Sequence, residues 1–196
     1  NLKEDRLIDS NNFRHINASE IIAIDHPWYR KGYVQQEIGY LPEWIIFYLR
    51  EKFLNFKKKF NASKKIFIDR SDSIYNHCKL INNQEIIKYL QSKGFTSYQV
   101  SKLDFVEQIY LFENADVIIS PHGAALTNII FSQPSLKLVE LIPNNHDSVK
   151  CQKISKILNF DYKRINLKQI DSVDSEGDIK IEISELNKIL ESLDCK

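Results

Sequence analysis

The sequence predicts an α/β protein built on a Rossmann-like parallel sheet with helices on both faces. Short, almost continuously apolar segments alternate with amphipathic segments from residue 64 to the C-terminus, and this alternation is typical of βαβ units. The apolar segments also lack the hydrophobic–polar alternation of a half-exposed strand, which indicates a parallel sheet covered on both sides.

Composition limits the classes of protein that fit. The chain has 196 residues, of which 43% are hydrophobic and 27% charged, as in ordinary globular proteins. Its 27 basic and 26 acidic residues give a net charge of +1, so we expect no nucleic acid partner, and any anion site must be local. No run of apolar residues is long enough for a transmembrane helix. The three cysteines have neither disulfide nor metal-ligand spacing.

The N-terminal part, residues 1–60, has a weaker pattern. It predicts a short strand at 20–26, an aromatic loop at 27–42, and a helix from Glu43 that runs into a lysine cluster. We interpret residues 1–60 as a linker and helical segment at the end of a further N-terminal domain, and 61–196 as the Rossmann-like domain. The chain begins with Asn and contains no Met, which agrees with a piece of a longer protein.

The first half of the predicted sheet domain has clear boundary signals. Asn82 and Glu85 fit a capping box and Gly94 fits the stop of the same helix. Asp104 is a good N-cap for the next helix. The elements expected here are strands at 64–69 and 97–100 and helices at 82–94 and 104–115.

The second half continues the alternation. Small residues open the helix after the strand that ends at Ser120, and Ser184 is the expected N-cap of the last helix. The charged segment 171–178 is the most obvious surface loop. The elements expected here are strands at 116–120, 136–142 and, at the sheet edge, 161–166, and helices at 123–132, 146–159 and 183–193.

Ligands of open parallel sheets bind beyond the carboxyl ends of the strands. This rule selects four groups of residues that should lie along one edge of the sheet. The groups are Asp69 with Arg70, Ser101 with Lys102, Ser120 to Gly123, and Glu140 to Pro143.

The sharpest of these groups lies between the strand at 116–120 and the next helix. The first amides of a helix are unpaired and favour anions, and Gly123, Ala124 and Ala125 would let an anionic group approach them closely. The alternative is close packing of helix against sheet, with His122 as a satisfied polar residue.

Two charged strand-end residues also allow two interpretations. Arg70 could bind a phosphate in bidentate fashion, or form a surface ion pair. Glu140 interrupts an apolar strand, and because a buried carboxylate is costly unless paired, it indicates either a ribose diol or an internal ion pair. No nucleophile–base motif is present, so a catalytic base is unknown and His122 is the candidate.

The sequence contains a set of residues in a fixed order, namely Arg70, Gly94, Phe95, Glu107, Gln108, Ala115, His122, Gly123, Ala124, Leu126, Asn128, Phe131, Val139, Glu140 and Leu141. This ordered set resembles the C-terminal half of glycosyltransferase family 61, over about residues 64–143. Only Lys79 is basic where that family usually has a second arginine, and Asn83 stands where a glutamate is common.

The resemblance implies an enzyme of the two-domain GT-B type, in which this chain is mainly the donor-binding half. The implied reaction is metal-independent, inverting transfer from a nucleotide sugar, with UDP expected, to a glycan or polysaccharide, as in capsular polysaccharide biosynthesis. No cofactor is implied beyond the donor substrate. The implied location is the cytoplasm for a bacterial protein and the secretory lumen for a eukaryotic one, and a homo-oligomer is left open.

The resemblance also implies roles for individual residues. Gln108 is expected to brace its helix rather than contact the donor. The donor-binding set is Arg70 with the amides of Gly123, Ala124 and Ala125 for the diphosphate, His122 for the phosphate or the sugar, Asn128 for the loop or the donor, Glu140 for the ribose, and Lys102 and Leu103 for the base ring. The alternatives to a transferase are a non-catalytic nucleotide-sugar-binding module and a sugar-nucleotide epimerase.

Overall fold

The computed structural model describes residues 8, 12, 15–20, 41–56, 61–73, 78–172 and 175–193. The expected strand at 20–26 and the aromatic loop at 27–42 lie almost entirely outside the described residues, as does the lysine cluster after residue 56.

The centre of the described chain is a five-stranded sheet in the order β2-β1-β3-β4-β5, and every neighbouring pair is parallel. The parallel sheet is therefore confirmed, with β5 at one edge. From β1 the chain moves outward to β2 and then crosses back to β3, so the strand order reverses between β1 and β3. The strands are β1 (Lys65–Ile68), β2 (Thr96–Tyr98), β3 (Val117–Pro121), β4 (Lys137–Pro143) and β5 (Asp161–Leu167).

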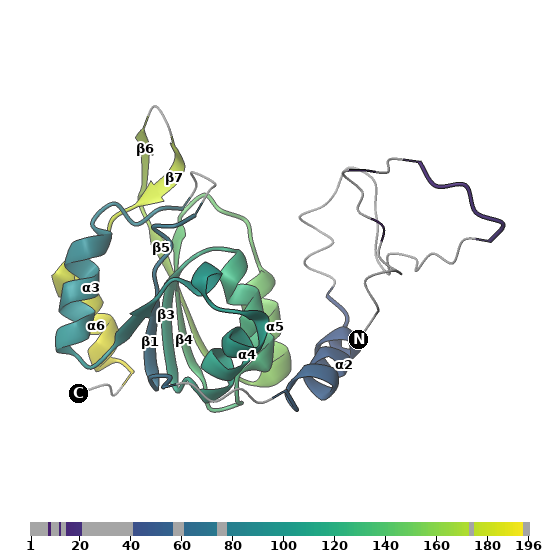
Figure 1. The fold of residues 1–196 in the computed structure, drawn as a ribbon. Coiled ribbons are helices and arrows are strands. Elements are labelled where there is room, and N and C mark those ends of the chain that lie inside the picture. The colour runs from purple at the N-terminus through teal and green to yellow at the C-terminus, as the bar shows by residue number, and fades with distance from the viewer. Residues whose placement is uncertain are drawn as a thin grey trace.

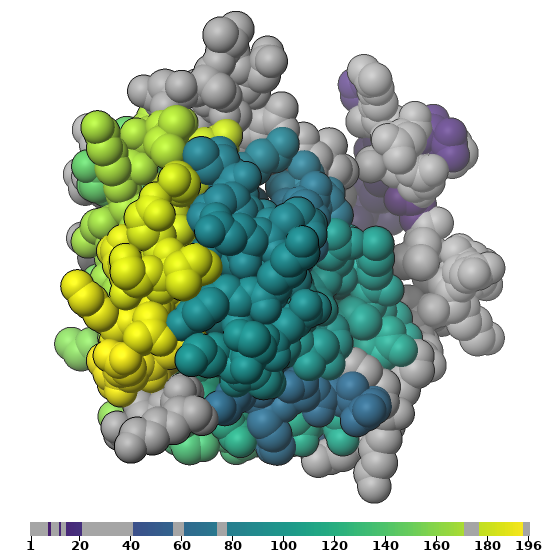
Figure 2. Space-filling model, turned by 90° about the vertical axis from the view of Figure 1, so that its left-hand side faces the viewer, coloured from purple at the N-terminus to yellow at the C-terminus, as the bar shows by residue number. Residues whose placement is uncertain are grey.

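Helices cover both faces of this sheet (Figure 1). One face carries α3 (Asn83–Ser92) and α6 (Ile183–Glu191), which lie side by side in Figure 2. The opposite face carries α2 (Glu43–Phe53), α4 (Phe105–Asn114), α5 (Lys150–Leu158) and the 3-10 helix η3 (Ala124–Phe131); a short 3-10 turn, η2 (Val100–Lys102), precedes α4.

Alternate strand residues feed two separate cores. Phe67 and Ile119 pack with α3 and α6, whereas Ile66 and Ile118 pack with the helices of the other face. All four side chains are buried, which explains why the strands read as continuous apolar runs. The Rossmann-like α/β fold predicted from the sequence is thus confirmed.

The helix expected at 123–132 is a 3-10 helix, one other helix begins later than expected, and the expected N-cap of the last helix is wrong. The helix expected from residue 146 begins at Lys150, because the His146 ring accepts a hydrogen bond from the Ser148 amide (3.1 Å) and holds a turn there. The last helix begins at Ile183 with Glu182 as its N-cap, so Ser184 lies inside it.

The prediction of a surface loop at 171–178 is wrong. The structure has an antiparallel hairpin there, β6 (Gln169–Ser172) and β7 (Ser175–Ile179), which projects beyond the strand ends (Figure 1). Ile179 is fully buried and exchanges backbone hydrogen bonds with the loop before α3, from the Ile81 amide (2.9 Å) and to the Lys79 carbonyl (2.8 Å). These long-range contacts order a segment whose local composition indicates a loop.

None of the helices in the described part of the chain is both long enough and apolar enough to cross a membrane.

Candidate functional site

Arg70 and the residues after β3 meet at the point where the strand order reverses. Arg70 follows β1, and its Nη1 donates a hydrogen bond to the carbonyl of His122. Its guanidinium lies so close to Gly123 that a Cβ there would overlap it. The expected convergence of these strand ends at one edge is confirmed, and Gly123 is needed for close approach of Arg70 rather than for a special backbone angle.

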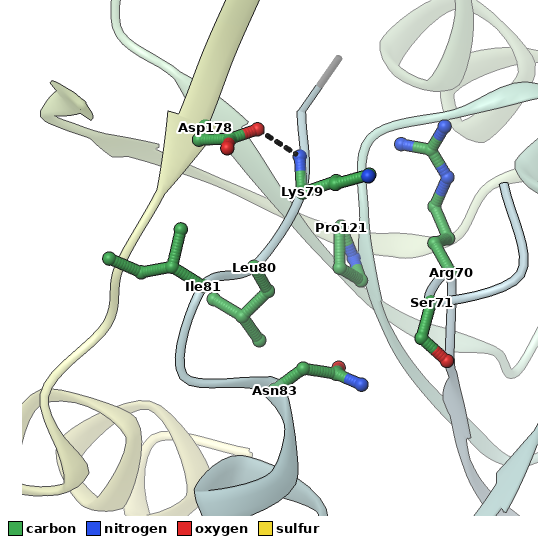
Figure 3. A pocket seen from close by; sticks show the side chains of 8 residues that line it. All are labelled: Arg70, Ser71, Lys79, Leu80, Ile81, Asn83, Pro121 and Asp178. Carbon is green, nitrogen blue, oxygen red and sulfur yellow. Dashed lines mark hydrogen bonds between the residues drawn. The ribbon is translucent and has the colours of Figure 1, made fainter. Parts of the chain in front are cut away.

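A pocket of about 360 Å³ opens beside Arg70 (Figure 3). Lys79 and Asn83 extend from one wall towards the Arg70 and Ser71 side. Two of the eight lining residues are cations and one is acidic, and Asp178 accepts a hydrogen bond from the Lys79 amide (3.1 Å). The pocket is lined by Arg70, Ser71, Lys79, Leu80, Ile81, Asn83, Pro121 and Asp178.

A buried carboxylate, Asp69, holds the loop that forms one wall of this pocket. It accepts hydrogen bonds from the Ser71 amide (2.9 Å) and hydroxyl (3.0 Å), from Asn83 Nδ2 (2.8 Å) and from Gln99 Nε2 (3.0 Å). Burial by itself raises the pKa of Asp69, but these hydrogen bonds outweigh it and the pKa is lowered. Ionised Asp69 therefore fixes the orientation of two pocket-lining side chains.

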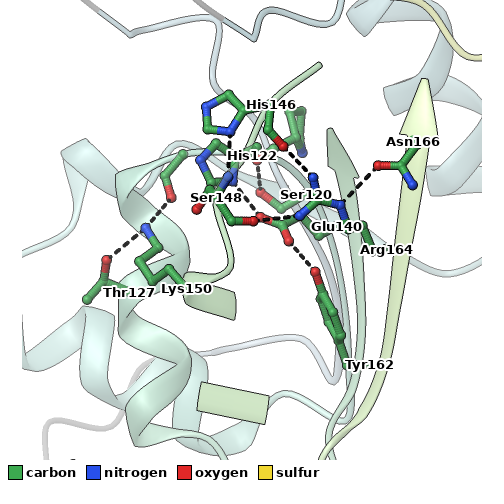
Figure 4. A network of polar contacts seen from close by, with 12 residues as sticks. Ser120, His122, Thr127, Glu140, His146, Ser148, Lys150, Tyr162, Arg164 and Asn166 are labelled. Atoms are coloured by element: carbon green, nitrogen blue, oxygen red, sulfur yellow. Dashed lines mark hydrogen bonds and ion pairs between the residues drawn. The ribbon is translucent and has the colours of Figure 1, made fainter. Parts of the chain in front are cut away.

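Lys150, which sequence reasoning missed, lies on another side of Gly123. Its Nζ donates to the Gly123 carbonyl (3.2 Å) and to the Thr127 hydroxyl (3.2 Å) (Figure 4). Among the described residues neither Arg70 nor Lys150 forms an ion pair with a carboxylate. The first turn of η3 is therefore flanked by two cations with neutral partners. The sequence offered one signal for Lys150, since it follows the end of β4 at the same sheet edge.

Glu140 lies at the centre of a buried hydrogen-bond network (Figure 4). One carboxylate oxygen is 2.5 Å from His122 Nδ1 and the other accepts from the Tyr162 hydroxyl at 2.5 Å. Burial by itself raises the pKa of Glu140, but hydrogen bonds with His122, Tyr162 and Cys151 outweigh it and the pKa is lowered. Glu140 is only 1% exposed. Of the two interpretations of this residue, the internal pair is present, because Glu140 contacts His122. Its contact with a ribose stays a prediction.

Three of these side chains are also the kind that bind metal ions. The potential ligand atoms of His122, Glu140 and Cys151 all lie within 4.8 Å of one another. The 2.5 Å separation of the histidine nitrogen and the carboxylate oxygen is a hydrogen-bond distance, and burial raises the pKa of the Cys151 thiol, which favours its protonated form. The cluster fits a hydrogen-bonded network, and the expectation of a metal-free site stays a prediction.

The loop after β4 covers His122. The His146 ring packs on the His122 ring with centroids 4.3 Å apart. Arg164 donates to the carbonyls of His146 and Ser148 and so holds this loop in place. His122 is buried, and its contact with phosphate or sugar stays a prediction.

The remaining predicted site residues lie outside the pocket. Lys102 is exposed and Leu103 packs against the core. Asn128 Nδ2 donates to Gln108 Oε1 (3.0 Å), and Gln108 Nε2 donates to the carbonyl of Leu103 (3.0 Å), which is the loop-fixing alternative for Asn128. Base-ring contacts of Lys102 and Leu103 stay predictions. Ala124 is exposed and Ala125 half-buried at the start of η3.

Fold and site together define a Rossmann-like domain with a crevice beside Arg70 and Lys79, beyond the carboxyl ends of its strands and at the reversal of strand order where such folds bind ligands. The chain belongs to the glycosyltransferase 61 family, whose family model matches residues 7–139.

Two plant proteins are among its relatives. The chain is 26% identical over 164 residues to "Beta-1,2-xylosyltransferase RCN11" of Oryza sativa subsp. japonica, covering 75% of this chain and 29% of that protein. It is 25% identical over 130 residues to "Beta-1,2-xylosyltransferase" of Arabidopsis thaliana, covering 60% of this chain and 23% of that protein. The matched region thus spans less than a third of either relative.

Proposed function

We propose that this chain carries the donor-binding region of a glycosyltransferase, which moves a sugar from a nucleotide sugar to a glycan or polysaccharide. The observation that carries the proposal is the placement of Arg70, without a carboxylate partner among the described residues, between the start of η3 and the pocket. The reversal of strand order between β1 and β3 lies at this position, and it is where doubly wound sheets bind nucleotides.

The chemistry of sugar transfer suits these residues. Negative charge develops on the leaving diphosphate, and preorganised donors stabilise such charge best where water is excluded. Arg70, Lys79 and the first amides of η3 supply positive charge at one place. This supports a GT-B type donor site in which side chains and backbone amides, rather than a metal ion, neutralise the diphosphate.

The nucleotide and the sugar are the next part of the proposal. We expect a UDP-sugar, and because both relatives are named as xylosyltransferases, UDP-xylose is the first donor to test. The polar groups of Ser71 and Asn83 in the pocket suit a hydroxyl-rich ligand. Inverting transfer also needs a group that takes the proton from the acceptor hydroxyl.

Calorimetry with UDP, GDP and CDP tests the donor site. The wild-type chain should bind one of them, and Arg70→Ala should weaken that binding roughly tenfold or more, because a hydrogen bond to a charged group is lost. Lys93→Ala, which changes an exposed lysine at the end of α3, is the control and should bind normally. A well-folded wild-type chain that binds none of the three nucleotides would contradict the proposal.

A nucleotide-sugar-binding module without catalysis is the second candidate. It is favoured by one observation, since the buried proton acceptors His122 and Glu140 are engaged with each other. The family match favours transfer over epimerisation. A transfer assay of the full-length protein with donor and glycan acceptors separates the candidates: binding without turnover supports the module.

For the location, the plant origin of both relatives favours the secretory lumen over the cytoplasm, and we propose the former. A tagged full-length protein found in the cytosol of its own cells would contradict this.

A further inference from the structure

Lys150 and Arg70 contact different atoms of the same glycine. The Arg70 guanidinium lies so close to Gly123 that a Cβ there would overlap it, and the Lys150 ammonium is 3.2 Å from the Gly123 carbonyl oxygen. The two side chains are far apart in the sequence, one after β1 and the other at the first residue of α5. Both cations are therefore within reach of one ligand seated on Gly123.

The ammonium of Lys150 has capacity for such a ligand. A lysine carries three N–H donors, and two of them are used by the Gly123 carbonyl and the Thr127 hydroxyl. Both partners are neutral, and within the described ranges no carboxylate pairs with Lys150. The side chain is half-buried, so its charge is only partly solvated, while its third donor remains available.

Two cations lie close to Gly123, and neither has a carboxylate within ion-pair distance among the described residues. Arg70 and Lys150 both lie at the start of η3, where unpaired amides add further positive potential. Like charges held close together repel, and an anion placed between them would remove that repulsion. A mere tie between α5 and η3 would not require a cation, because a neutral donor could bridge the same two oxygens.

We infer that Lys150 is a second phosphate-binding cation, which contacts the diphosphate of the donor from the side of Gly123 that Arg70 does not reach. The inference rests on the proposed donor site and adds to it a residue from α5. The diphosphate lies over the start of η3, with Arg70 on one side and Lys150 on the other.

The test compares ligands with and without the diphosphate. Inorganic pyrophosphate, UDP and uridine are titrated by calorimetry into the wild-type chain and into Lys150→Gln, which keeps a donor for Gly123 and removes the charge. Lys150→Gln should weaken UDP and pyrophosphate binding roughly tenfold and leave uridine binding unchanged, because a charge-assisted hydrogen bond is lost only with phosphate. Lys150→Arg should restore most of the affinity.

Lys153→Gln is the matched control, since Lys153 is an exposed lysine on the same helix, and it should bind all three ligands as the wild type does. If UDP and pyrophosphate bind Lys150→Gln as tightly as the wild-type chain, Lys150 is not a phosphate ligand. If uridine and UDP lose affinity equally, its role is structural, and the inference is overturned. If the wild-type chain binds neither UDP nor pyrophosphate, the proposed donor site fails, and the inference fails with it.

Discussion

Glu140 is a buried charge whose stability depends on three donors. Its oxygens are bonded to His122 and Tyr162, and Cys151 also donates to it. Glu140→Gln removes the charge and turns one acceptor into a donor, which then faces another donor. We expect the free energy of unfolding to fall by about 2 kcal/mol, the value of a hydrogen bond to a charged group, measured by urea denaturation at pH 7.

The loss should depend on pH. The pKa of Glu140 in the folded chain lies below its ordinary value of 4.5, so ionised Glu140 stabilises the fold above that value, and the contribution is lost as pH falls towards the folded pKa. The difference between wild type and Glu140→Gln should therefore shrink below about pH 4.5. Glu185→Gln, at an exposed carboxylate of α6, should show little difference at either pH. If the free energies of unfolding of wild type and Glu140→Gln differ by the same amount at pH 7 and pH 3.5, then packing, not charge, explains the lower stability of the variant.

Substitutions at Gly123 and Gly94 should separate effects on ligand binding from effects on the stability of the fold. Gly123 has an extended backbone with φ 170°, which any residue can adopt, but a Cβ there would displace the flexible guanidinium of Arg70. Gly94 has φ +82° and no atom within 4 Å of an added Cβ. Gly123→Ala should therefore weaken UDP binding several-fold at little cost in stability, since it acts through Arg70.

Gly94→Ala should do the reverse and lower the free energy of unfolding by about 1 kcal/mol through backbone strain while UDP affinity stays unchanged. Calorimetry and urea denaturation of both variants provide the measurement. Equal UDP affinity of Gly123→Ala and the wild-type chain would show that the close approach of Arg70 to Gly123 does not serve the ligand.

The sequence could indicate individual site residues but not their partners. Arg70 and His122 were found because strand ends of a parallel sheet share one edge. Tyr162 and Lys150 were not found, because their contacts with Glu140 and Gly123 depend on which strand neighbours which. A carboxylate within an apolar strand indicates that the residue has a polar partner. The sequence does not identify that partner as Tyr162, because Tyr162 comes near Glu140 only through the register of β4 on β5.

Two helix starts that look alike in the sequence differ in the structure. Asp104 caps α4 through a complete capping box, with Oδ1 accepting from the Glu107 amide (2.8 Å) and Glu107 Oε2 accepting from the Asp104 amide (3.0 Å). Ser184 was expected to cap α6 but lies within it. Asp104→Ala should therefore cost about 1 kcal/mol of unfolding free energy, and Asp104→Asn should retain most of it.

Ser184→Ala is the counterpart in which the sequence and the structure disagree. If Ser184 were an N-cap, Ser184→Ala would lower the free energy of unfolding as much as Asp104→Ala does. If Ser184 lies inside the helix, the change should leave the free energy of unfolding unchanged or raise it slightly, because alanine has the higher helix propensity. Urea denaturation of both variants decides between these outcomes. A loss of about 1 kcal/mol for Ser184→Ala would favour the start expected from the sequence.

Local signals predicted elements well where the element is also locally stabilised. Gly94 ends α3 as expected, with a positive φ and with the Phe95 amide bonded to the Leu90 carbonyl at 3.0 Å. The capping box expected at Asn82 is wrong, because Asn82 Nδ2 instead donates to Glu85 Oε2 and to the Ile181 carbonyl. Both the side chain of Asn82 and the β6–β7 hairpin are held by contacts with distant parts of the chain. The hairpin is fixed by the backbone hydrogen bonds of Ile179, and a local sequence pattern does not predict such contacts.

The fold brings Arg70 and Gly123 together where the strand order reverses. All four strand-end groups face the same edge, and residues from β7 and α5, which the sequence left outside the site, complete it through Asp178 and Lys150. A parallel sheet of this kind leaves the carboxyl ends of its strands open at that edge, which is where such folds bind ligands.

The contacts of α2 bear on how much of the chain the domain needs to fold. The sequence placed the domain boundary at residue 61, yet Ile46 of α2 is 1% exposed and packs in the core of one sheet face. Arg50 of the same helix donates to the carbonyls of Ile130 and, at 2.7 Å, Ser132, at the end of η3. We expect α2 to be part of the cooperative unit rather than a linker.

Ile46→Ala should therefore lower the free energy of unfolding of the whole chain by roughly 2–5 kcal/mol, as for other buried large-to-small changes. Phe47→Ala, at a side chain that is 50% exposed on the same helix, should cost far less. A fragment comprising 61–196 should unfold at lower urea than the full chain, because it exposes the core surface that Ile46 covers. If the fragment is as stable as the chain and Ile46→Ala is neutral, the boundary at residue 61 is correct and α2 only rests on the domain.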